Sequence, residues 1–232
     1  MPNAPALEYG QYYHLFNRGN NGEDLFVEPR NYPYFLQLFA RFVEPVADTY
    51  AYCLLRNHFH LLVRIKTEQE QMQGQGQGQP QTFGVQNQTP KVEMSQTPKV
   101  GVSRIPKVLT KVLRPSQQFS NWFNAYAKAI NRAYGRTGSL FEHPFERRAV
   151  DSEGYLAQLV VYVHRNPQKH GLVRDFRDWP YSSLPALLSS KPTHLKRDEV
   201  LAWFGGVEGF VSAHEREVAE EQLATLMVED VH

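Results

Sequence analysis

The segment Asn57-His58-Phe59-His60-Leu61-Leu62-Val63 predicts a β-strand that carries two histidines on one face. Successive side chains of a strand point to opposite faces, so His58 and His60 share one face while Phe59 and Leu61 take the other. From the rise per residue, the two imidazoles lie about 7 Å apart, close enough to converge on one cation or one phosphate oxygen. Two half-buried histidines bonded to backbone carbonyls are the structural alternative for an isolated His-x-His, and the rest of the chain must decide between the two.

The residues before this strand predict an α+β pattern. Thr49–Arg56 and His58–Ile65 are apolar-rich runs separated by Arg56-Asn57, which indicates an antiparallel hairpin with a tight turn. Further upstream, the aromatic run at residues 12–17 predicts a strand. Asn31–Val43 has apolar side chains three and four residues apart, which is typical of an amphipathic helix.

The residues after 115 predict two helices and a short strand. Ser116–Gly135 keeps aromatic and aliphatic side chains at helical spacing. Glu146–Val150 predicts a short strand, and a helix over residues 153–167 follows, with Asp151 or Ser152 as its N-cap.

The helix over residues 153–167 has one face on which polar and aromatic side chains recur. The members of this face step by four, three and four residues: Tyr155, Leu159, Tyr162 and Asn166. Tyr162 and Asn166 are one turn apart, so a hydroxyl and an amide project together. Pro167 and Gly171 are expected to end the helix.

The segment between the two halves of this pattern has a different composition. Every second residue from Gln69 to Gln81 is glutamine, and a Pro-Lys-Val triplet then recurs three times with a period of eight. Too little of it is apolar to be buried, so residues 67–115 are expected to be a long, disordered, low-complexity insertion. A basic arm that binds DNA is the functional alternative, because Lys91–Arg114 carries six basic residues and one acid.

The domain organisation follows from these patterns. We expect residues 1–66 and 116–185 to form the two halves of one domain, interrupted by the insertion at 67–115. Residues 186–232 are expected to form a helical C-terminal extension, whose Glu-rich end disfavours contact with phosphates.

Composition narrows the class of protein. The chain has 232 residues, of which 41% are hydrophobic, and its net charge is +1, so a nucleic-acid partner would need locally clustered charge. Cys53 is the single cysteine, which excludes an internal disulfide and a Cys-based zinc site. We find no signal-peptide pattern at the start and no run near the roughly 20 apolar residues of a membrane span. The expectation is a cytoplasmic protein without a membrane partner.

Basic and aromatic residues alternate along and after the helix at 116–135. Such a surface suits a nucleic-acid backbone with exposed bases, while the alternative is a solvated helix face beside ordinary core aromatics. The basic candidates for DNA binding are Lys128, Arg132, Arg136, Arg147 and Arg148.

Five short motifs stand in order between residues 12 and 184. They are Phe16-Asn17-Arg18-Gly19-Asn20, His58-Phe59-His60, Phe141-Glu142-His143-Pro144-Phe145, Tyr162-Val163-His164-Arg165-Asn166-Pro167 with Gln168-Lys169-His170-Gly171, and Asp178-Trp179-Pro180-Tyr181-Ser182-Ser183. Together they resemble the single-tyrosine HUH transposases, especially the branch associated with repetitive extragenic palindromes. Arg18, Arg165 and Lys169, which belong to these motifs, join the candidates for DNA binding.

The resemblance implies a fold and an activity. The fold would be a ferredoxin-like (RRM-like) αβ sandwich with a central antiparallel sheet and helices on one face. The activity would be that of a metal-dependent nuclease and strand transferase, acting on single-stranded DNA hairpins as a monomer or homodimer. In these terms His58 and His60 are ligands of Mg²⁺ or Mn²⁺, Tyr162 is the nucleophile and Asn166 is the third ligand. Two features depart from the family pattern. Many relatives carry Gln or a carboxylate where this chain has Asn166 as third ligand, and the long insertion separates the metal-binding strand from the nucleophile helix.

The chemistry suits these side chains. A cation on a non-bridging phosphate oxygen withdraws negative charge that repels nucleophiles, and attack by Tyr162 would leave a 5′-phosphotyrosine and a free 3′-OH. A second 3′-OH could reverse the step and join strands. Two alternatives stay open: a domesticated hairpin-binding protein without strand transfer, and a metal phosphodiesterase that uses water. His143, His164 and His170 are expected to be solvated, capping or loop residues.

Overall fold

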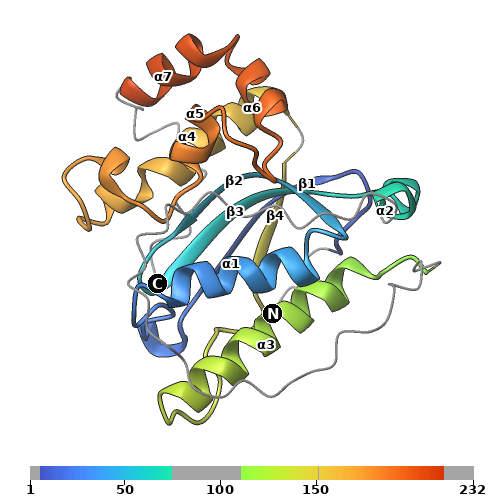
Figure 1. The fold of residues 1–232 in the computed structure, drawn as a ribbon, viewed down its shortest axis with the longest axis vertical. Helices are drawn as coiled ribbons and strands as arrows, with labels where there is room; N and C mark the ends of the chain where they lie inside the picture. The colour runs from blue at the N-terminus through green and yellow to red at the C-terminus, as the bar shows by residue number, and fades with distance from the viewer. Residues whose placement is uncertain (1–5, 75–110, 151, 217–232) are drawn as a thin grey trace.

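A four-stranded antiparallel sheet lies at the centre of the computed structural model, which describes residues 6–74, 111–150 and 152–216 (Figure 1). The strands lie in the order β2-β3-β1-β4, and every neighbouring pair is antiparallel. Their bounds are β1 Tyr12–Arg18, β2 Ala47–Leu54, β3 His58–Ile65 and β4 Glu146–Val150.

Two helices connect these strands in the ferredoxin-like order. Helix α1 (Asn31–Phe42) links β1 to β2, and helix α3 (Pro115–Ala133) precedes β4. The order β1-α1-β2-β3-α3-β4 on this sheet confirms the predicted α+β, ferredoxin-like fold.

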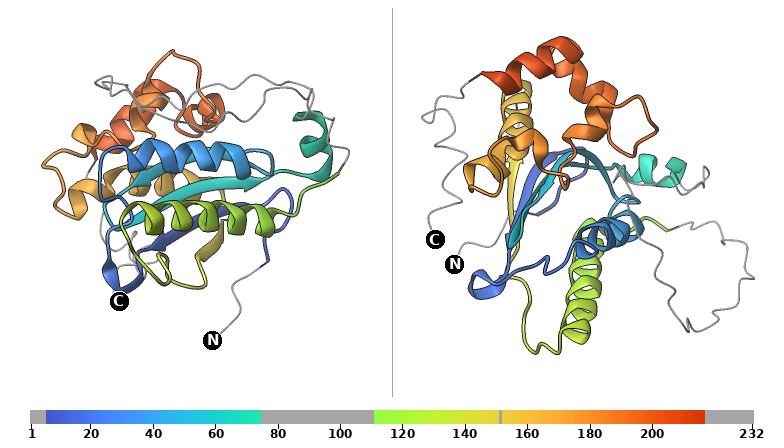
Figure 2. Two further views of the ribbon diagram at one scale, coloured as in Figure 1. Left: turned by 60° about the horizontal axis from the view of Figure 1, so that its bottom comes forward. Right: turned by 60° about the vertical axis from the view of Figure 1, so that its left-hand side comes forward.

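Helices cover both faces of the sheet (Figure 2). Helices α1 and α3 lie on one face, and helix α4 (Glu153–Lys169) crosses the other. The expectation of helices on one face is therefore wrong. Apolar side chains surround much of α4, with Leu159, Val160 and Val163 fully buried, so this helix needs cover on both sides. It packs on β2 and β3 and is itself covered by the C-terminal helices.

The covering elements are short. The C-terminal elements are the 3₁₀ turn η2 (Phe176–Asp178) and the helices α5 (Leu184–Leu188), α6 (Arg197–Trp203) and α7 (Val207–Glu215). Elsewhere in the fold, a second 3₁₀ turn, η1 (Asn20–Gly22), follows β1. Helices α6 and α7 confirm the predicted helical extension as far as the described residues reach. Within those residues, no helix is long and apolar enough to cross a membrane.

Strand β3 separates two kinds of side chain, as its alternation predicts. Phe59 points toward α1 and α3, where its ring centroid lies 5.2 Å from that of Phe35 and 5.6 Å from that of Trp122. The buried indole of Trp122 donates to the Phe35 carbonyl over 3.1 Å, so this core leaves no indole N–H unsatisfied. His58 and His60 point to the opposite face, beneath α4.

Local signals placed the ends of α4 within two residues. The Ser152 hydroxyl accepts a hydrogen bond from the Tyr155 N–H over 3.4 Å, which makes Ser152 the N-cap. The helix continues through Pro167 to Lys169, so the expectation that Pro167 ends it is wrong. Pro167 lies in the last turn, where its missing N–H removes only one helical hydrogen bond.

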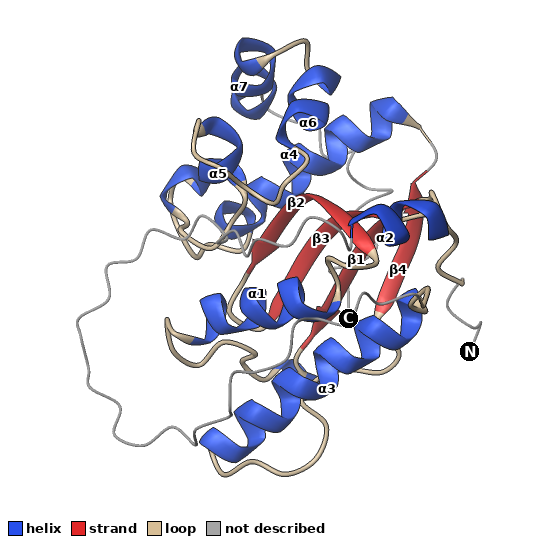
Figure 3. Cartoon of the chain, turned by 45° about the vertical axis from the view of Figure 1, so that its right-hand side comes forward, coloured by secondary structure: helices blue, strands red, loops and turns tan. Residues whose placement is uncertain are grey.

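The expected disorder of residues 67–115 is wrong for residues 68–74, which form about two helical turns, and for Pro115, the first residue of α3. Helix α2 spans Glu68–Gly74 (Figure 3). Thr67 and Glu70 form a capping box: the Thr67 N–H donates to the Glu70 carboxylate over 2.7 Å, and the Glu70 N–H donates to the Thr67 hydroxyl over 3.2 Å. The Thr-x-x-Glu spacing was present in the sequence as a helix-start signal. Residues 75–110, with the Pro-Lys-Val triplets and most of the proposed basic arm, lie outside the described residues.

Candidate functional site

His60 is the centre of a cluster of rings on the α4 side of the sheet. Its ring centroid lies 5.3 Å from that of His14, 5.2 Å from that of His58 and 5.6 Å from that of Tyr162. The sheet register explains the contact with β1: Phe16 stands opposite His60, and His14, two residues earlier, shares the face of Phe16. Helix α4 contributes Tyr162 from above.

Hydrogen bonds orient both histidines of β3. The Nδ1 atom of His58 lies 2.8 Å from Oδ1 of Asn57, and Nδ1 of His60 lies 3.1 Å from Nε2 of His14. An amide oxygen only accepts, so Nδ1 of His58 carries the proton and Nε2 carries the lone pair.

The surroundings of His60 favour its neutral imidazole. Burial is the main cause that lowers the pKa of His60 well below its ordinary value, and the neighbouring His58 and His14 lower it further. His60 is therefore neutral at physiological pH. A neutral imidazole is the form that binds a metal ion.

Two residues of α4 and its C-cap residue, His170, follow one face of this helix on the side of His58 and His60. Tyr162, Asn166 and His170 are four residues apart and share one face of the helix. Tyr162 lies against His60, and the His170 ring lies 4.7 Å from the His58 ring. Asn166 lies between Tyr162 and His170 in sequence, one helical turn from Tyr162, and its side chain is fully buried. Of the predicted catalytic and metal residues, the structure thus brings together His58, His60 and Tyr162, and Asn166 donates to the carbonyl of Tyr162.

The side chain of Asn166 is fully buried, and its two polar atoms differ in their hydrogen bonding. Its Nδ2 donates to the carbonyl of Tyr162 over 2.9 Å, while its Oδ1 has no hydrogen-bond partner among the described residues. A buried acceptor without a donor costs free energy unless a ligand or water satisfies it. The amide oxygen is therefore a candidate ligand atom.

Tyr162 is buried, with 2% of its surface exposed. The ammonium of Lys169, on the last turn of α4, lies 5.5 Å from the centroid of its ring. A positive charge thus lies beside the phenol ring.

Two members of the cluster were not predicted from the sequence. His14 was not singled out, and His170 was interpreted as a helix-end residue. The signal for His14 was its place in the aromatic run of residues 12–17, but only the pairing of β1 with β3 puts it beside His60.

The two arginines of β4 point to opposite faces of the sheet. The guanidinium of Arg147 lies 5.0 Å from the ring centroid of Phe145, and that of Arg148 lies 5.8 Å from the ring centroid of Phe16. Arg148 therefore shares the face of His60. Arg18, opposite His58 in the register, shares that face too and lies 3.6 Å from a carboxylate oxygen of Glu142.

The remaining basic candidates lie on α3 or directly after it. Lys128 and Arg132 are exposed on this helix, which covers the other face of the sheet. Arg136 forms an ion pair with Glu23 and donates to Oδ1 of Asn131 over 2.9 Å. The predicted DNA-binding residues are thus divided between two faces.

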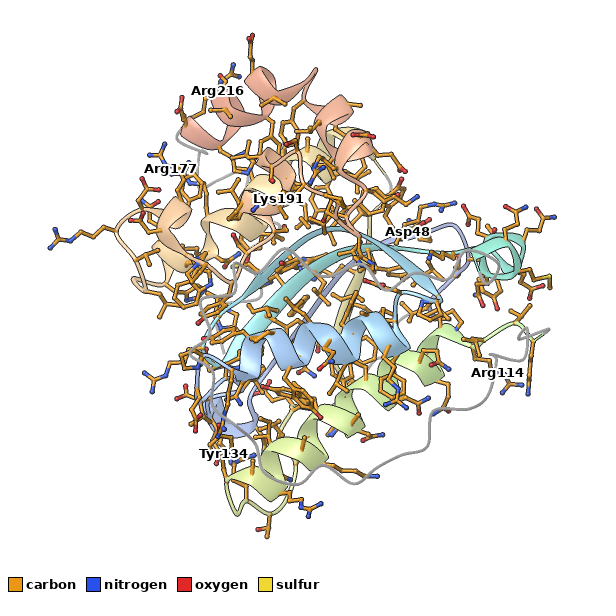
Figure 4. The ribbon with its side chains drawn as sticks, viewed as in Figure 1. Asp48, Arg114, Tyr134, Arg177, Lys191 and Arg216 are labelled. Atoms are coloured by element: carbon orange, nitrogen blue, oxygen red, sulfur yellow. The ribbon has the colours of Figure 1, made fainter. Side chains whose placement is uncertain are left out.

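Arg165 is engaged within the protein, which the sequence did not suggest. Its guanidinium donates to the carbonyl of Arg216 over 2.6 Å and to that of His214 over 3.4 Å, and it lies 5.7 Å from the ring centroid of Phe176. Arg216 directly follows α7, at the far side of the molecule from α1 and α3 (Figure 4). Arg165 therefore joins α4 to the C-terminal extension.

The donor set decides which third ligand a metal could have. Across residues 6–74, 111–150 and 152–216, no group of three or more His, Cys, Asp and Glu side chains is arranged to hold a metal ion. A third protein ligand beside His58 and His60 would therefore be of another type, and the buried amide oxygen of Asn166 on α4 is a candidate.

Comparisons with known proteins give one informative match. No protein-family model matches the chain, and no curated protein matches it. Among solved structures, a REP-associated tyrosine transposase bound to a REP hairpin is similar over 83% of this chain and 88% of that chain, with a TM-score of 0.50 and 15% sequence identity. The chain has the fold of that transposase. At this level of identity the likeness concerns the fold, and it confirms the predicted resemblance at that level.

Proposed function

We propose that this chain is a metal-dependent endonuclease and strand transferase that cuts and rejoins single-stranded DNA beside a hairpin. The observation that carries the proposal is the contact of Tyr162 with His60, 5.6 Å between ring centroids, on the sheet face that also carries His58. The structural neighbour supports the proposal, because it is a tyrosine transposase bound to a REP hairpin.

The site residues fit Mg²⁺ or Mn²⁺. His58 carries its lone pair on Nε2, His60 is neutral, and Oδ1 of Asn166 is a buried acceptor without a hydrogen-bond partner. Imidazole nitrogen and amide oxygen are acceptable ligands for Mn²⁺, and oxygen suits Mg²⁺. When bound, such a cation would withdraw charge from a non-bridging phosphate oxygen.

Tyr162 would act as the nucleophile. The phenol loses its proton as its oxygen forms a bond to phosphorus, and the bond from phosphorus to the 3′ oxygen breaks. The departing oxygen takes up a proton to become a 3′-OH, so that no net proton is gained or lost. The Lys169 ammonium lies beside the ring, where it would offset negative charge that develops during attack. A second 3′-OH can reverse the step, because the phosphotyrosine linkage retains a phenol as leaving group.

A covalent-adduct assay tests this proposal. Labelled single-stranded hairpin oligonucleotides are mixed with the full chain in Mn²⁺ or in EDTA, and the adduct is resolved on a denaturing gel. Tyr162→Phe is compared with Tyr155→Phe, a matched change on the same helix. We expect a metal-dependent adduct with the wild type and Tyr155→Phe, and none with Tyr162→Phe, which should still bind DNA. An adduct that persists in Tyr162→Phe would exclude Tyr162 as the nucleophile.

A hairpin-binding protein without strand transfer is the second candidate function. The burial of Tyr162 favours it, because a phosphate must reach a hydroxyl that the described conformation covers. Hairpin binding without any adduct, in Mg²⁺ and in Mn²⁺, would support this candidate. Cleavage that survives Tyr162→Phe without an adduct would instead indicate a phosphodiesterase that uses water.

A further inference from the structure

The side chain of His14 is fully buried and lies in contact with His60. Its Nε2 is 3.1 Å from Nδ1 of His60, and the two rings stack at 25° between their planes. His60 is itself 2% exposed. A hydrogen bond between two ring nitrogens contains one proton, so one ring donates and the other accepts.

The direction of this hydrogen bond decides what His60 can do. If Nδ1 of His60 donates, Nε2 of His60 carries the lone pair. If Nε2 of His14 donates, the proton of neutral His60 is on Nε2, which then cannot bind a cation. In both cases His14 occupies Nδ1 of His60. His60 can therefore hold a metal ion only through Nε2, and only while His14 accepts.

We infer that His14 is a positioning residue that holds His60 as its Nδ1–H tautomer and so directs Nε2 toward the metal. This inference rests on the proposed function. A partner that fixes the tautomer of a metal-binding histidine is a general feature of metal sites. Asn57 has the same role for His58, where the amide oxygen permits one direction only. His14 differs because an imidazole can accept or donate.

The sheet makes this contact a fixed feature of the fold. Phe16 stands opposite His60 and His14 stands opposite Leu62, so His14 and His60 are diagonal neighbours on one face of β1 and β3. A shift of register by one residue would turn His14 to the face of Phe59. The core therefore holds the two imidazoles together.

Two measurements on the full chain test the inference. Nitrogen chemical shifts of ¹⁵N-histidine-labelled, metal-free wild type report which nitrogen of His60 is protonated, and the expected form is Nδ1–H. Calorimetric titration with Mn²⁺ in the absence of DNA then compares the wild type with His14→Phe, which removes the acceptor, and His14→Gln, which restores an amide oxygen. We expect about 10- to 100-fold weaker Mn²⁺ binding for His14→Phe and recovery for His14→Gln.

The outcomes separate this inference from the proposed function. A His60 protonated on Nε2 in the wild type would overturn the inference, whether or not either variant folds. So would wild-type Mn²⁺ affinity in a folded His14→Phe variant, and in that case the metal-dependent proposal would stand. Absence of Mn²⁺ binding by the wild type, with His60 as the Nδ1–H tautomer, would instead remove the metal from the proposed function and leave His14 as the residue that sets the tautomer.

Discussion

The Nδ1 atom of His164 lies 2.9 Å from Nε2 of His214 and joins α4 to α7. His214 donates from Nδ1 to the Phe210 carbonyl over 2.8 Å, so its Nε2 accepts and Nδ1 of His164 donates. Nε2 of His164 then accepts from the hydroxyl of Ser183 over 2.7 Å. With both imidazoles neutral, every ring nitrogen of this buried chain has a partner.

Acid should therefore weaken the fold. Burial lowers the pKa of His214 to about 4, and burial together with His214 keeps the pKa of His164 well below its ordinary value. Both groups titrate near 6.5 in the unfolded chain, which then binds more protons below that pH. The stability they support is fully present above pH 6.5 and is lost as pH falls toward 4, with about 3 kcal/mol from His214. Urea denaturation between pH 4 and pH 8 measures this loss.

Two histidine variants control for the other titrating groups. His214→Gln should flatten the pH dependence of the free energy of unfolding. His143→Gln, a change in an exposed loop, should leave the wild-type profile. Equal profiles for all three proteins would show that the loss of stability arises elsewhere.

Gln71 should stabilise the chain on both sides of residues 75–110. Its side chain is 1% exposed, and its Oε1 accepts from the Leu113 N–H over 3.0 Å. Gln71→Ala leaves this N–H without its partner and should lower the free energy of unfolding by about 1–3 kcal/mol. Gln69→Ala, an exposed position on the same helix, should change it by less than about 0.5 kcal/mol. Chemical denaturation checks both values, and similar effects from the two changes would contradict the role given to Gln71.

Arg148 and Arg165 should differ in their effect on hairpin binding. Arg148 shares the face of His60, so Arg148→Ala should weaken binding of a single-stranded hairpin and reduce the dependence of affinity on salt by about one phosphate contact. Arg165→Ala should preserve hairpin affinity, because that guanidinium binds the carbonyls of Arg216 and His214. It should instead lower stability by about 1–2 kcal/mol. Fluorescence anisotropy at several salt concentrations distinguishes the two, and loss of affinity in a folded Arg165→Ala would reverse the assignment.

Local sequence signals predicted the parts of the fold that depend on near neighbours. The alternation of His58, Phe59 and His60 gave the two faces of β3, and Ser152 gave the start of α4. The placement of Tyr162 and Asn166 one helical turn apart follows from helical spacing alone. Each of these features needs only a few consecutive residues, so the surrounding structure had little opportunity to override them.

Contacts between segments far apart in the chain could not be predicted from local sequence patterns. His14 joins the cluster because β1 pairs with β3, across more than 40 residues of chain. Arg165 binds carbonyl groups within the protein because the C-terminal extension folds back on α4, and the sequence pattern near Arg165 does not reveal this contact. The second covered face of the sheet has the same origin. Pairings of this kind depend on tertiary structure rather than on local propensity.

The last prediction concerns the two faces of β3. Phe59 is 1% exposed and packs against Phe35 and Trp122, so Phe59→Ala should lower the free energy of unfolding by about 3–5 kcal/mol. Phe16→Ala, a partly exposed position on the other face, should cost less but should disturb His60, whose ring centroid lies 6.1 Å away. Urea denaturation with calorimetric Mn²⁺ titration separates the effects. Folded Phe59→Ala should bind Mn²⁺ like the wild type, since the side chain of Phe59 points away from the histidines. If Phe59→Ala instead binds Mn²⁺ more weakly than Phe16→Ala does, the two faces of the sheet are coupled.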